Sequence, residues 1–410
     1  MKRYIALILA VIFITSAFFG CSKKENGDGD GAKKVTLTVW GPQEDQPDSD
    51  GWLPTMCKLF NDAHPEWDIT FKYGVCSEGD AGKNISQDPS GAADVYFFAN
   101  DQLGALLQAN AISRLGGTAL EEVKESNSEN MIATVTSTDG GVYGVPFSGN
   151  TWYMFYNKSI FSEEDVKSLD RMLEKGQVAF PLTNSWYMGA FYLANGCTLF
   201  GDSGTDAAAG IDFGGKAGVE ATQYLVSLAK NKNFVNDTEG SGLSGLLDGS
   251  IGAVFTGSWD AKKISDALGK NYGAAPLPTA RIGGSEKQLL SFAGSKAVGV
   301  NPNCKDPEVA VALAAFLGSY EAQKRHYEMR SIIPSNKKLL EDEALLSDIA
   351  AQAQDKTISD TAIVQPSIPE MASYWVPVEN MGKAIVNGDV TKENAKEKTE
   401  ALNESLKASL

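Results

Sequence analysis

The stretch ADVYFFANDQLGALLQANAI, residues 93–112, places a continuous apolar run directly before a helix-forming segment. Two other segments are similar: KKVTLTVWG, residues 33–41, has apolar residues at every second position, and IGAVFTG, residues 251–257, is almost wholly apolar. Runs of this length are typical of strands that are buried between helices. We therefore expect each of the three to be a strand of an α/β protein.

Helix signals alternate with these strands. Asp306 is a suitable N-cap, Pro307 occupies the first helical position, and apolar residues follow at helical spacing. A second stripe at helical spacing comprises Val219, Leu225 and Leu228. Because the sheets of α/β proteins bind ligands beyond the carboxyl ends of their strands, the residues that follow each strand are the first candidates for a site.

Aromatic residues lie beside amides or carboxylates after all three strands. The three places are Trp40 with residues 41–45, Phe97-Phe98 with residues 99–102, and Trp259-Asp260. This combination suits a carbohydrate, because the C–H faces of a sugar lie on aromatic rings while its hydroxyls donate to Asp, Glu, Asn and Gln. Aromatic residues near strand ends also serve as core residues, so each instance leaves both interpretations open.

The N-terminus has the pattern of a bacterial lipoprotein signal. A basic start is followed by a nearly unbroken apolar run from Tyr4 to Phe19 and then by Gly20-Cys21. We expect residues 1–20 to be a signal peptide and Cys21 to be the lipidated end of an exported protein that is held at the membrane; an uncleaved anchor is the alternative. Residues 22–34 are almost free of apolar side chains, so residues 21–34 are expected to form a flexible tether.

Length and charge narrow the class of protein. A chain of 410 residues exceeds what one hydrophobic core usually supports, which favours two domains. Residues 1–20 hold two of the 36 basic residues and none of the 52 acidic ones, so the remainder has a net charge of about −18. Such a surface repels polyanions, and we expect no nucleic acid partner. A neutral or cationic ligand is compatible with this charge.

Catalytic and metal motifs are missing from the sequence. It contains no H-E-x-x-H, G-x-S-x-G or P-loop motif and no C-x-x-C pair, so we expect no metal site and no cofactor. Cys57 and Cys76 either pair or remain buried thiols. His64 and His326, the only histidines, have no recognisable catalytic neighbour and are expected at the surface or in caps. A glycoside hydrolase with two carboxylates is the alternative enzyme class, although no spacing singles out a pair.

Four segments together resemble the maltose/maltodextrin-binding proteins of ABC importers, within the extracellular solute-binding protein group. They are residues 93–112, GVYGVPFSGNTWYMFYNKSIF at 141–161, NYGAAPLPT at 271–279, and IPEMASYWVPVENMGKAIVNG at 368–388. The resemblance extends over residues 35–410. It implies two α/β lobes joined by a hinge, a periplasmic-binding-protein-like fold with the ligand cleft between the lobes. One lobe would hold residues 35–148 plus 297–344, and the other residues 149–296 plus 345–410.

The resemblance also implies the site and the partners. Phe98, Trp186, Trp259 and Trp375 look like stacking platforms, Glu44 and Asp101 look like hydroxyl partners, and Tyr187 looks like a residue that closes the site. Three further positions depart from the family pattern: Asn150 where a carboxylate is frequent, Gln102 where an arginine is common, and Asp45 where a lysine is common. The implied ligand is a maltodextrin or related neutral oligosaccharide, and the implied partners are the transmembrane subunits of a permease, with the binding protein as a monomer.

Trp375 allows two interpretations. Met371, Tyr374, Trp375 and Val378 fall near helical spacing, so Trp375 is either one more core residue or a platform in the early turns of a helix that begins at the cleft wall. The resemblance favours the platform. A scaffold or adhesin that displays a sugar-binding surface without transport is a third class that fits the same residues.

Overall fold

The computed structural model describes residues 32–46, 50–201, 204–238 and 240–408. The expected signal peptide, Cys21 and nearly all of the tether therefore lie outside the described residues. The first strand, β1, begins at Lys33, so the tether was predicted to extend two residues too far. Lys33 and Lys34 pair with Trp67 and Asp68 of the neighbouring strand, and the Lys33 ammonium lies 2.6 Å from a carboxylate oxygen of Asp306. These contacts bring residues 33 and 34 into the sheet.

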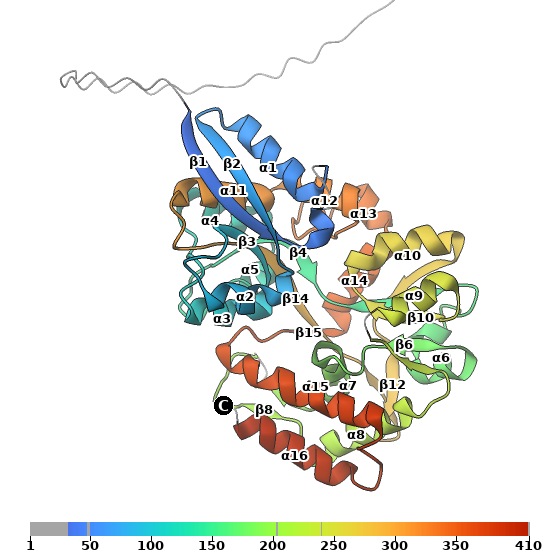
Figure 1. Cartoon of the computed structure of the whole chain (residues 1–410). Helices are drawn as coiled ribbons and strands as arrows, with labels where there is room; N and C mark the ends of the chain where they lie inside the picture. The colour runs from blue at the N-terminus through green and yellow to red at the C-terminus, as the bar shows by residue number, and fades with distance from the viewer. Residues whose placement is uncertain (1–31, 47–49, 202–203, 239, 409–410) are drawn as a thin grey trace, which may run out of the picture.

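The chain forms two α/β lobes (Figure 1). A six-stranded sheet has the order β15-β14-β3-β1-β2, with β4 beside β14. The first lobe is built on β1 to β4 and the later part of β14, whereas β15 pairs with Ser291–Ala293 at the start of β14, next to the second core. Strands β1, β2 and β3 run parallel, whereas β14 is antiparallel to β3 and β4. The elements of this lobe are β1 Lys33–Gly41, η1 Gln43–Asp45, α1 Trp52–Ala63, β2 Trp67–Val75, η2 Glu78–Asp80, α2 Ala81–Gln87, β3 Val95–Ala99, η3 Asn100–Gln102, α3 Leu103–Gln108, α4 Gly117–Ser126, α5 Glu129–Ala133, β4 Val145–Asn150, β14 Ser291–Val300, α11 Pro307–Leu317 and α12 Tyr320–Arg330.

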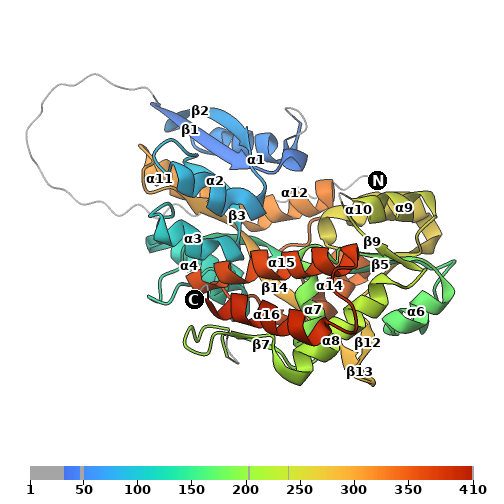
Figure 2. The ribbon, with the colours of Figure 1, turned by 60° about the horizontal axis from the view of Figure 1, so that its bottom comes forward.

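The second lobe is built on a sheet with the order β11-β5-β10-β6-β9, and two short ribbons, β7-β8 and β12-β13, accompany it. Helices α15 and α16 pack on α7 and α8 (Figure 2). The elements are β5 Tyr153–Asn157, η4 Asp165–Lys167, α6 Leu169–Lys175, β6 Val178–Phe180, α7 Ser185–Ala194, β7 Thr198–Leu199, β8 Ile211–Asp212, α8 Gly215–Ala229, β9 Phe234–Asn236, α9 Ser241–Asp248, β10 Ala253–Thr256, η5 Ser258–Asp260, α10 Ala261–Leu268, η6 Gly269–Asn271, β11 Tyr272–Ala275, β12 Thr279–Ile282, β13 Ser285–Gln288, α13 Glu343–Ser347, α14 Ile349–Asp360, β15 Ala362–Val364, η7 Pro369–Met371, α15 Ala372–Asn387 and α16 Ala395–Ala408.

Each lobe has its own hydrophobic core. The first core draws its buried side chains from residues 35–147 and 297–322, and the second from residues 152–292 and 368–406. A smaller cluster joins α9, α10 and α14 to the other face of the second sheet. Because few buried side chains are shared, each lobe can keep its packing while the angle between the lobes changes.

Strand β14 passes from one core to the other. Its residue Phe292 belongs to the second core, whereas Ala297 belongs to the first. Gly294, midway between them, lies so close to Asn100 that a Cβ at this position would approach Oδ1 of Asn100 to 1.9 Å. The chain also crosses between the cores from β4 to β5 and from α12 to α14. Three crossings at one place form the hinge-like junction beside which the cleft lies.

The expected strands and helices are confirmed where residue patterns were strong. The segments 33–41, 93–100 and 251–257 contain β1, β3 and β10, and α11 begins at Pro307 with Asp306 as its N-cap. Val95 to Ala99 are all buried, because both faces of this central strand are covered by helices. Leu225 and Leu228 of the expected stripe lie on the buried face of α8, whereas Val219 is half-buried.

Candidate functional site

A cleft of about 1150 Å³ lies between the lobes. Its first-lobe wall includes the 3₁₀ turns η1, η2 and η3, which follow the carboxyl ends of β1, β2 and β3. Its second-lobe wall includes η5, which follows β10, together with the first turns of α7, α10 and α15. The residues that follow the strands thus meet at one cavity, as expected for an α/β sheet.

Three of the four proposed platforms line this cleft. Trp186, Trp259 and Trp375 are each half-buried and belong to the second lobe. The ring centroids of Trp186 and Trp259 lie 6.2 Å apart, with 31° between the ring planes. Aromatic rings that are only partly covered by protein offer the remaining surface to a ligand.

Local structure positions Trp186. The side chain of Asn184 caps α7 by accepting a 2.9 Å hydrogen bond from the backbone N–H of Trp186. The indole Nε1 of Trp186 donates to Oε1 of Gln365 at 2.7 Å. The helix cap therefore places the Cα atom, and Gln365 restricts rotation of the ring.

The structure separates Tyr374 from Trp375. Tyr374 is 0% exposed and donates a 2.8 Å hydrogen bond to the carbonyl of Ser185, so it is the core residue of this pair. A Cβ at Gly189 would approach the Tyr374 hydroxyl to 2.1 Å, which shows how closely α7 and α15 pack. Trp375, the fourth residue of α15, contacts Phe292 and Tyr374 through edge-to-face packing and lines the cleft.

Phe98 does not serve as a platform in this structure. Its side chain is 0% exposed, belongs to the first-lobe core and packs against Tyr96 and beneath Gly144. The prediction that Phe98 is a stacking platform is therefore wrong, because Phe98 belongs to the central strand β3 and both faces of that strand are covered.

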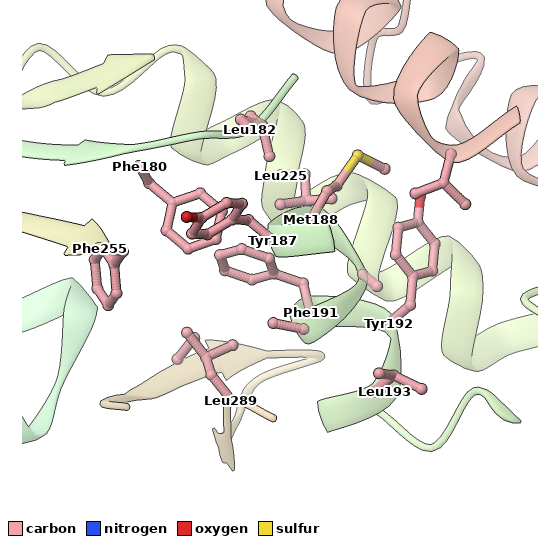
Figure 3. Packing of buried hydrophobic residues seen from close by; sticks show 14 of the residues in the cluster. Phe180, Leu182, Tyr187, Met188, Phe191, Tyr192, Leu193, Leu225, Phe255 and Leu289 are labelled. Atoms are coloured by element: carbon pink, nitrogen blue, oxygen red, sulfur yellow. The ribbon is translucent and has the colours of Figure 1, made fainter. Parts of the chain in front are cut away.

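Tyr187 also lies in a different place from the one predicted. Its ring packs among Phe180, Phe191 and Phe255 in the second-lobe core (Figure 3). It lines an adjoining cavity of about 530 Å³ rather than the main cleft. Burial raises the pKa of the Tyr187 hydroxyl. Tyr187 therefore packs edge-to-face against Trp186 and does not cover the cleft.

The proposed polar residues line the cleft, but their environments differ. Glu44 is exposed on η1, and Asn150 is buried at the end of β4. Asp101 lies on η3, where Nε2 of Gln102 donates to its Oδ2 at 2.7 Å. Burial raises the pKa of Asp101 to about 6, although the hydrogen bond from Gln102 favours the ionised form. Asp101 is therefore a half-buried acceptor that is protonated more easily than an ordinary aspartate.

The carboxylate of Asp45 contacts two side chains of α12, those of His326 and Arg330. Its Oδ1 lies 3.0 Å from Nε2 of His326 and accepts from Nε of Arg330 at 3.3 Å. Burial alone would raise the pKa of Asp45, but His326 and Arg330 outweigh burial and hold the pKa below its ordinary value. Asp45 lines the cleft with its carboxylate already engaged within the first lobe.

His326 was expected at the surface or in a cap, and this prediction is wrong. The imidazole is 3% exposed, stacks on Trp52 at 4.0 Å between ring centroids and lines the cleft beside Asp45. His64 agrees with the expectation, because it is half-exposed at the C-terminal end of α1. Nothing near His326 in the sequence indicated its partner.

Lys296 is a cleft residue that the sequence analysis did not identify. Its Nζ lies 3.2 Å from Oε1 of Glu78 on the first lobe and 5.0 Å from the ring centroid of Trp259 on the second. A lone lysine within the strand SFAGSKAVGV was the signal that could have identified it, since a charge inside a buried strand requires a partner.

The described residues hold no group of three metal-ligating side chains arranged for an ion. Within the same residues, every helix is too short or too polar to span a bilayer. Cys57 and Cys76 are both buried as free thiols, so of the two alternatives the structure has the unpaired one. Burial raises the pKa of Cys57 to about 12, which makes it unreactive.

Comparisons with known proteins agree with this architecture. A family model described as bacterial extracellular solute-binding protein matches residues 55–354. Maltodextrin-binding protein MdxE of Bacillus subtilis is 27% identical over 433 residues, covering 95% of this chain and 97% of the relative. The galactooligosaccharide-binding protein of the same organism is 25% identical over 410 residues, covering 95% of this chain and 93% of the relative.

A solved structure with acarbose is 52% identical to this chain. The superposition covers 92% of this chain and 100% of the chain in that structure, with a TM-score of 0.89. This likeness confirms the prediction of a two-lobed α/β fold of the periplasmic-binding-protein kind.

Proposed function

The chain belongs to the bacterial extracellular solute-binding proteins, and on that premise we propose that it captures malto-oligosaccharides in the inter-lobe cleft for a carbohydrate ABC importer. The observation that carries this proposal is the set of three half-buried tryptophans, Trp186, Trp259 and Trp375, beside carboxylates and amides in one cavity of about 1150 Å³. Tryptophan faces bind the apolar sides of sugar rings, and the polar groups accept hydrogen bonds from hydroxyls.

Two of the similar proteins favour an α-glucan over other neutral oligosaccharides. One is named for maltodextrin, and the solved structure at 52% identity is with acarbose, an amine-bearing analogue of malto-oligosaccharides. The cleft also carries several carboxylates, among them Glu44, Asp101 and Asp260, which are compatible with a neutral or a cationic sugar. A galacto-oligosaccharide is the second candidate ligand, because a relative of similar identity is named for it.

Binding proceeds without turnover in this proposal. Asp101 and Asp260 both have a raised pKa, chiefly because of burial, and a raised carboxyl pKa is also a property of glycosidase acids. Glycoside hydrolysis additionally needs a second, ionised carboxylate that faces the first across the scissile bond. The similar proteins are binding proteins, which supports capture rather than cleavage.

The two lobes provide the signal to the permease. We place residues 35–148 plus 297–344 in one rigid lobe and residues 149–296 plus 345–410 in the other, with the crossings of the chain as the hinge. A sugar that contacts both walls binds the closed shape more tightly and shifts the population towards it. The permease then distinguishes the closed, loaded protein from the open, empty one.

Anchoring completes the proposal. Cleavage before Cys21 and lipidation of its thiol would hold a monomeric binding protein at the outer face of the cell membrane, with a short tether before β1. The basic start, the apolar run and Gly20-Cys21 support this step.

Calorimetric titration of the purified protein without its signal peptide tests the function. We expect saturable binding of maltotriose, maltotetraose and acarbose at least tenfold tighter than binding of a galacto-oligosaccharide of equal length. Incubation with maltotetraose should release no glucose or maltose. Tighter binding of the galacto-oligosaccharide would replace the proposed ligand, and cleavage that disappears in Asp101→Asn would move the protein to the hydrolase class.

A further inference from the structure

Gln365 is a buried amide at the junction of the lobes, and both N–H donors of its NH2 group are unused. It follows β15 directly, is 2% exposed, and its backbone N–H donates to the carbonyl of Ala293 at 2.8 Å. Its Oε1 accepts the 2.7 Å hydrogen bond from Trp186, whereas its Nε2 has no hydrogen-bond partner. A buried donor without a partner is destabilising, so its presence calls for an explanation.

Asp101 lies on the other side of this amide. The side chain of Gln365 is near enough to favour the ionised form of Asp101, although no hydrogen bond joins them in this structure. Close packing brings their segments together: a Cβ at Gly104, just after η3, would approach the backbone of Ser367 and Pro369 to 3.2 Å. The acceptor of Gln365 thus faces a tryptophan of the second lobe, and its donor faces a carboxylate of the first.

We propose that Gln365 is a positioning residue of the carbohydrate site, which holds the Trp186 ring through Oε1 and orients the Asp101 carboxylate through Nε2. Gln365 does not line the cleft, so it acts on a sugar only through these two neighbours. Closure of the lobes brings Asp101 to Nε2, so one of the two unused N–H donors gains an acceptor in the closed shape. This inference rests on the proposed function and assigns a residue that makes the two walls of the site respond together.

The charged surroundings of Asp101 allow its titration to report on Gln365. Nε2 of Gln102 donates to the Asp101 carboxylate, and the Asp101 backbone and the Gln365 side chain also favour its ionised form. The charged or titratable groups of the adjacent cleft wall are Glu44 and Asp45 on η1, Glu78 and Asp80 on η2, Lys83 on α2, His326 and Arg330 on α12, and Lys296 on β14. Lys296 is paired with Glu78, and Asp45 with His326 and Arg330. None of these groups is changed by substitution of Gln365.

Two substitutions of Gln365 separate its roles. Gln365→Leu removes both the donor and the acceptor, and Gln365→Glu keeps an acceptor for Trp186 but places a negative charge beside Asp101. We expect maltotriose affinity at pH 7.5 to fall about 3- to 10-fold in each variant, from the loss of one or two hydrogen bonds. The pH at which affinity is half lost on acidification should rise from the wild type to Gln365→Leu and further to Gln365→Glu, because the ionised form of Asp101 is progressively disfavoured.

A double-mutant cycle tests the contact with Trp186. Trp186→Phe removes the Nε1 donor and also part of the ring that faces the sugar, so the loss of binding free energy in the double variant should be smaller than the sum of the two single losses. Gln352→Leu replaces an exposed glutamine on α14 and is the matched control, for which we expect unchanged affinity and an unchanged pH midpoint. Melting temperatures of all variants confirm that the titrated proteins are folded.

The outcomes distinguish this inference from the proposed function. If the wild type binds malto-oligosaccharides but its pH midpoint is the same in both Gln365 variants, or if the effects of Trp186→Phe and Gln365→Leu simply add, the positioning role is wrong and the function stands. If the wild type binds none of the sugars, the proposed function itself is wrong.

Discussion

Replacing Trp375 with alanine should weaken both maltotriose binding and the fold, whereas truncation of a comparable tryptophan outside the cleft should weaken the fold alone. Trp375 is half-buried in the fourth position of α15, with one edge packed against Phe292 at 6.2 Å and Tyr374 at 5.0 Å between ring centroids. The remaining surface of the ring lines the cleft. The substitution therefore removes both a core contact and a ligand contact, and the two losses are measured by different assays.

The two losses of free energy are of similar size. Covering one face of an indole with a sugar ring is worth about 1–3 kcal/mol of apolar burial. Losing it corresponds to a dissociation constant about 5- to 150-fold higher. A fully buried tryptophan costs about 3–5 kcal/mol of folding free energy when truncated, and since Trp375 is only half-buried we expect about 2 kcal/mol.

Trp67 provides a matched control in the same chain. It is also half-buried and packs against His64 and Phe60 at 4.7 and 5.9 Å between ring centroids, but it lies on the first lobe and does not line the cleft. Trp67→Ala should lower the free energy of unfolding by a similar amount and leave affinity unchanged. Calorimetric titration with maltotriose and urea denaturation of both variants give the two quantities for each.

Equal affinities in the two variants would refute the platform role of Trp375. So would a strongly lowered unfolding free energy in Trp375→Ala with near-normal affinity in the folded fraction, because that result describes a core residue. A loss of affinity confined to Trp375→Ala, at comparable stability, agrees only with direct contact between the ring and the sugar.

Four further outcomes follow from the structure. Because the pKa of Asp101 is raised to about 6, acidification through pH 6 should protonate it and lower affinity, and calorimetry of Asp101→Asn should show a flatter pH dependence. Asp45→Ala should reduce the free energy of unfolding, measured in urea, by about 3 kcal/mol, because His326 is left buried without its partner. The pKa of Asp45 is lowered from 3.8, so its contribution to stability is complete above pH 4 and is lost as the pH falls further. Small-angle scattering should show a smaller radius of gyration with saturating maltotriose, and an unchanged radius would contradict closure. Cys21→Ala or globomycin should leave the precursor unprocessed, whereas continued cleavage at the same site would exclude a lipoprotein.

Much of the fold was predictable because its signals are local. Buried parallel strands show as short apolar runs, and β1, β3 and β10 have that character. A proline after an N-cap marks the first turn of α11 whatever its surroundings. Lys33 and Lys34 were assigned both to the tether and to the first strand, because lysines have little strand preference of their own, and pairing with Trp67 and Asp68 places them in the sheet.

The polar residues of the cleft were harder to predict, since their partners are distant in the sequence. Asp45 and His326 are 281 residues apart, and Glu78 and Lys296 are 218 apart. A single sequence contains no signal that joins such pairs, and composition alone made His326 an ordinary surface residue. Only the fold, which brings α12 beside η1 and β14 beside η2, places them in contact.

The position of each aromatic residue relative to its strand decides whether it faces the core or the cleft. Phe98 is a residue of β3, and because helices cover both faces of that strand, its ring has nowhere to point except into the core. Trp259 follows a different strand, β10, and lies in η5, just beyond the end of that strand. There the backbone has left the sheet, and side chains reach the space beyond the strand ends. In α7 the rotation of about 100° per residue sends Trp186 to the cleft and its neighbour Tyr187 into the core. Platforms in a fold of this kind should therefore be sought in the turn or first helical turn after a strand, and an aromatic residue within the strand should be assigned to the core.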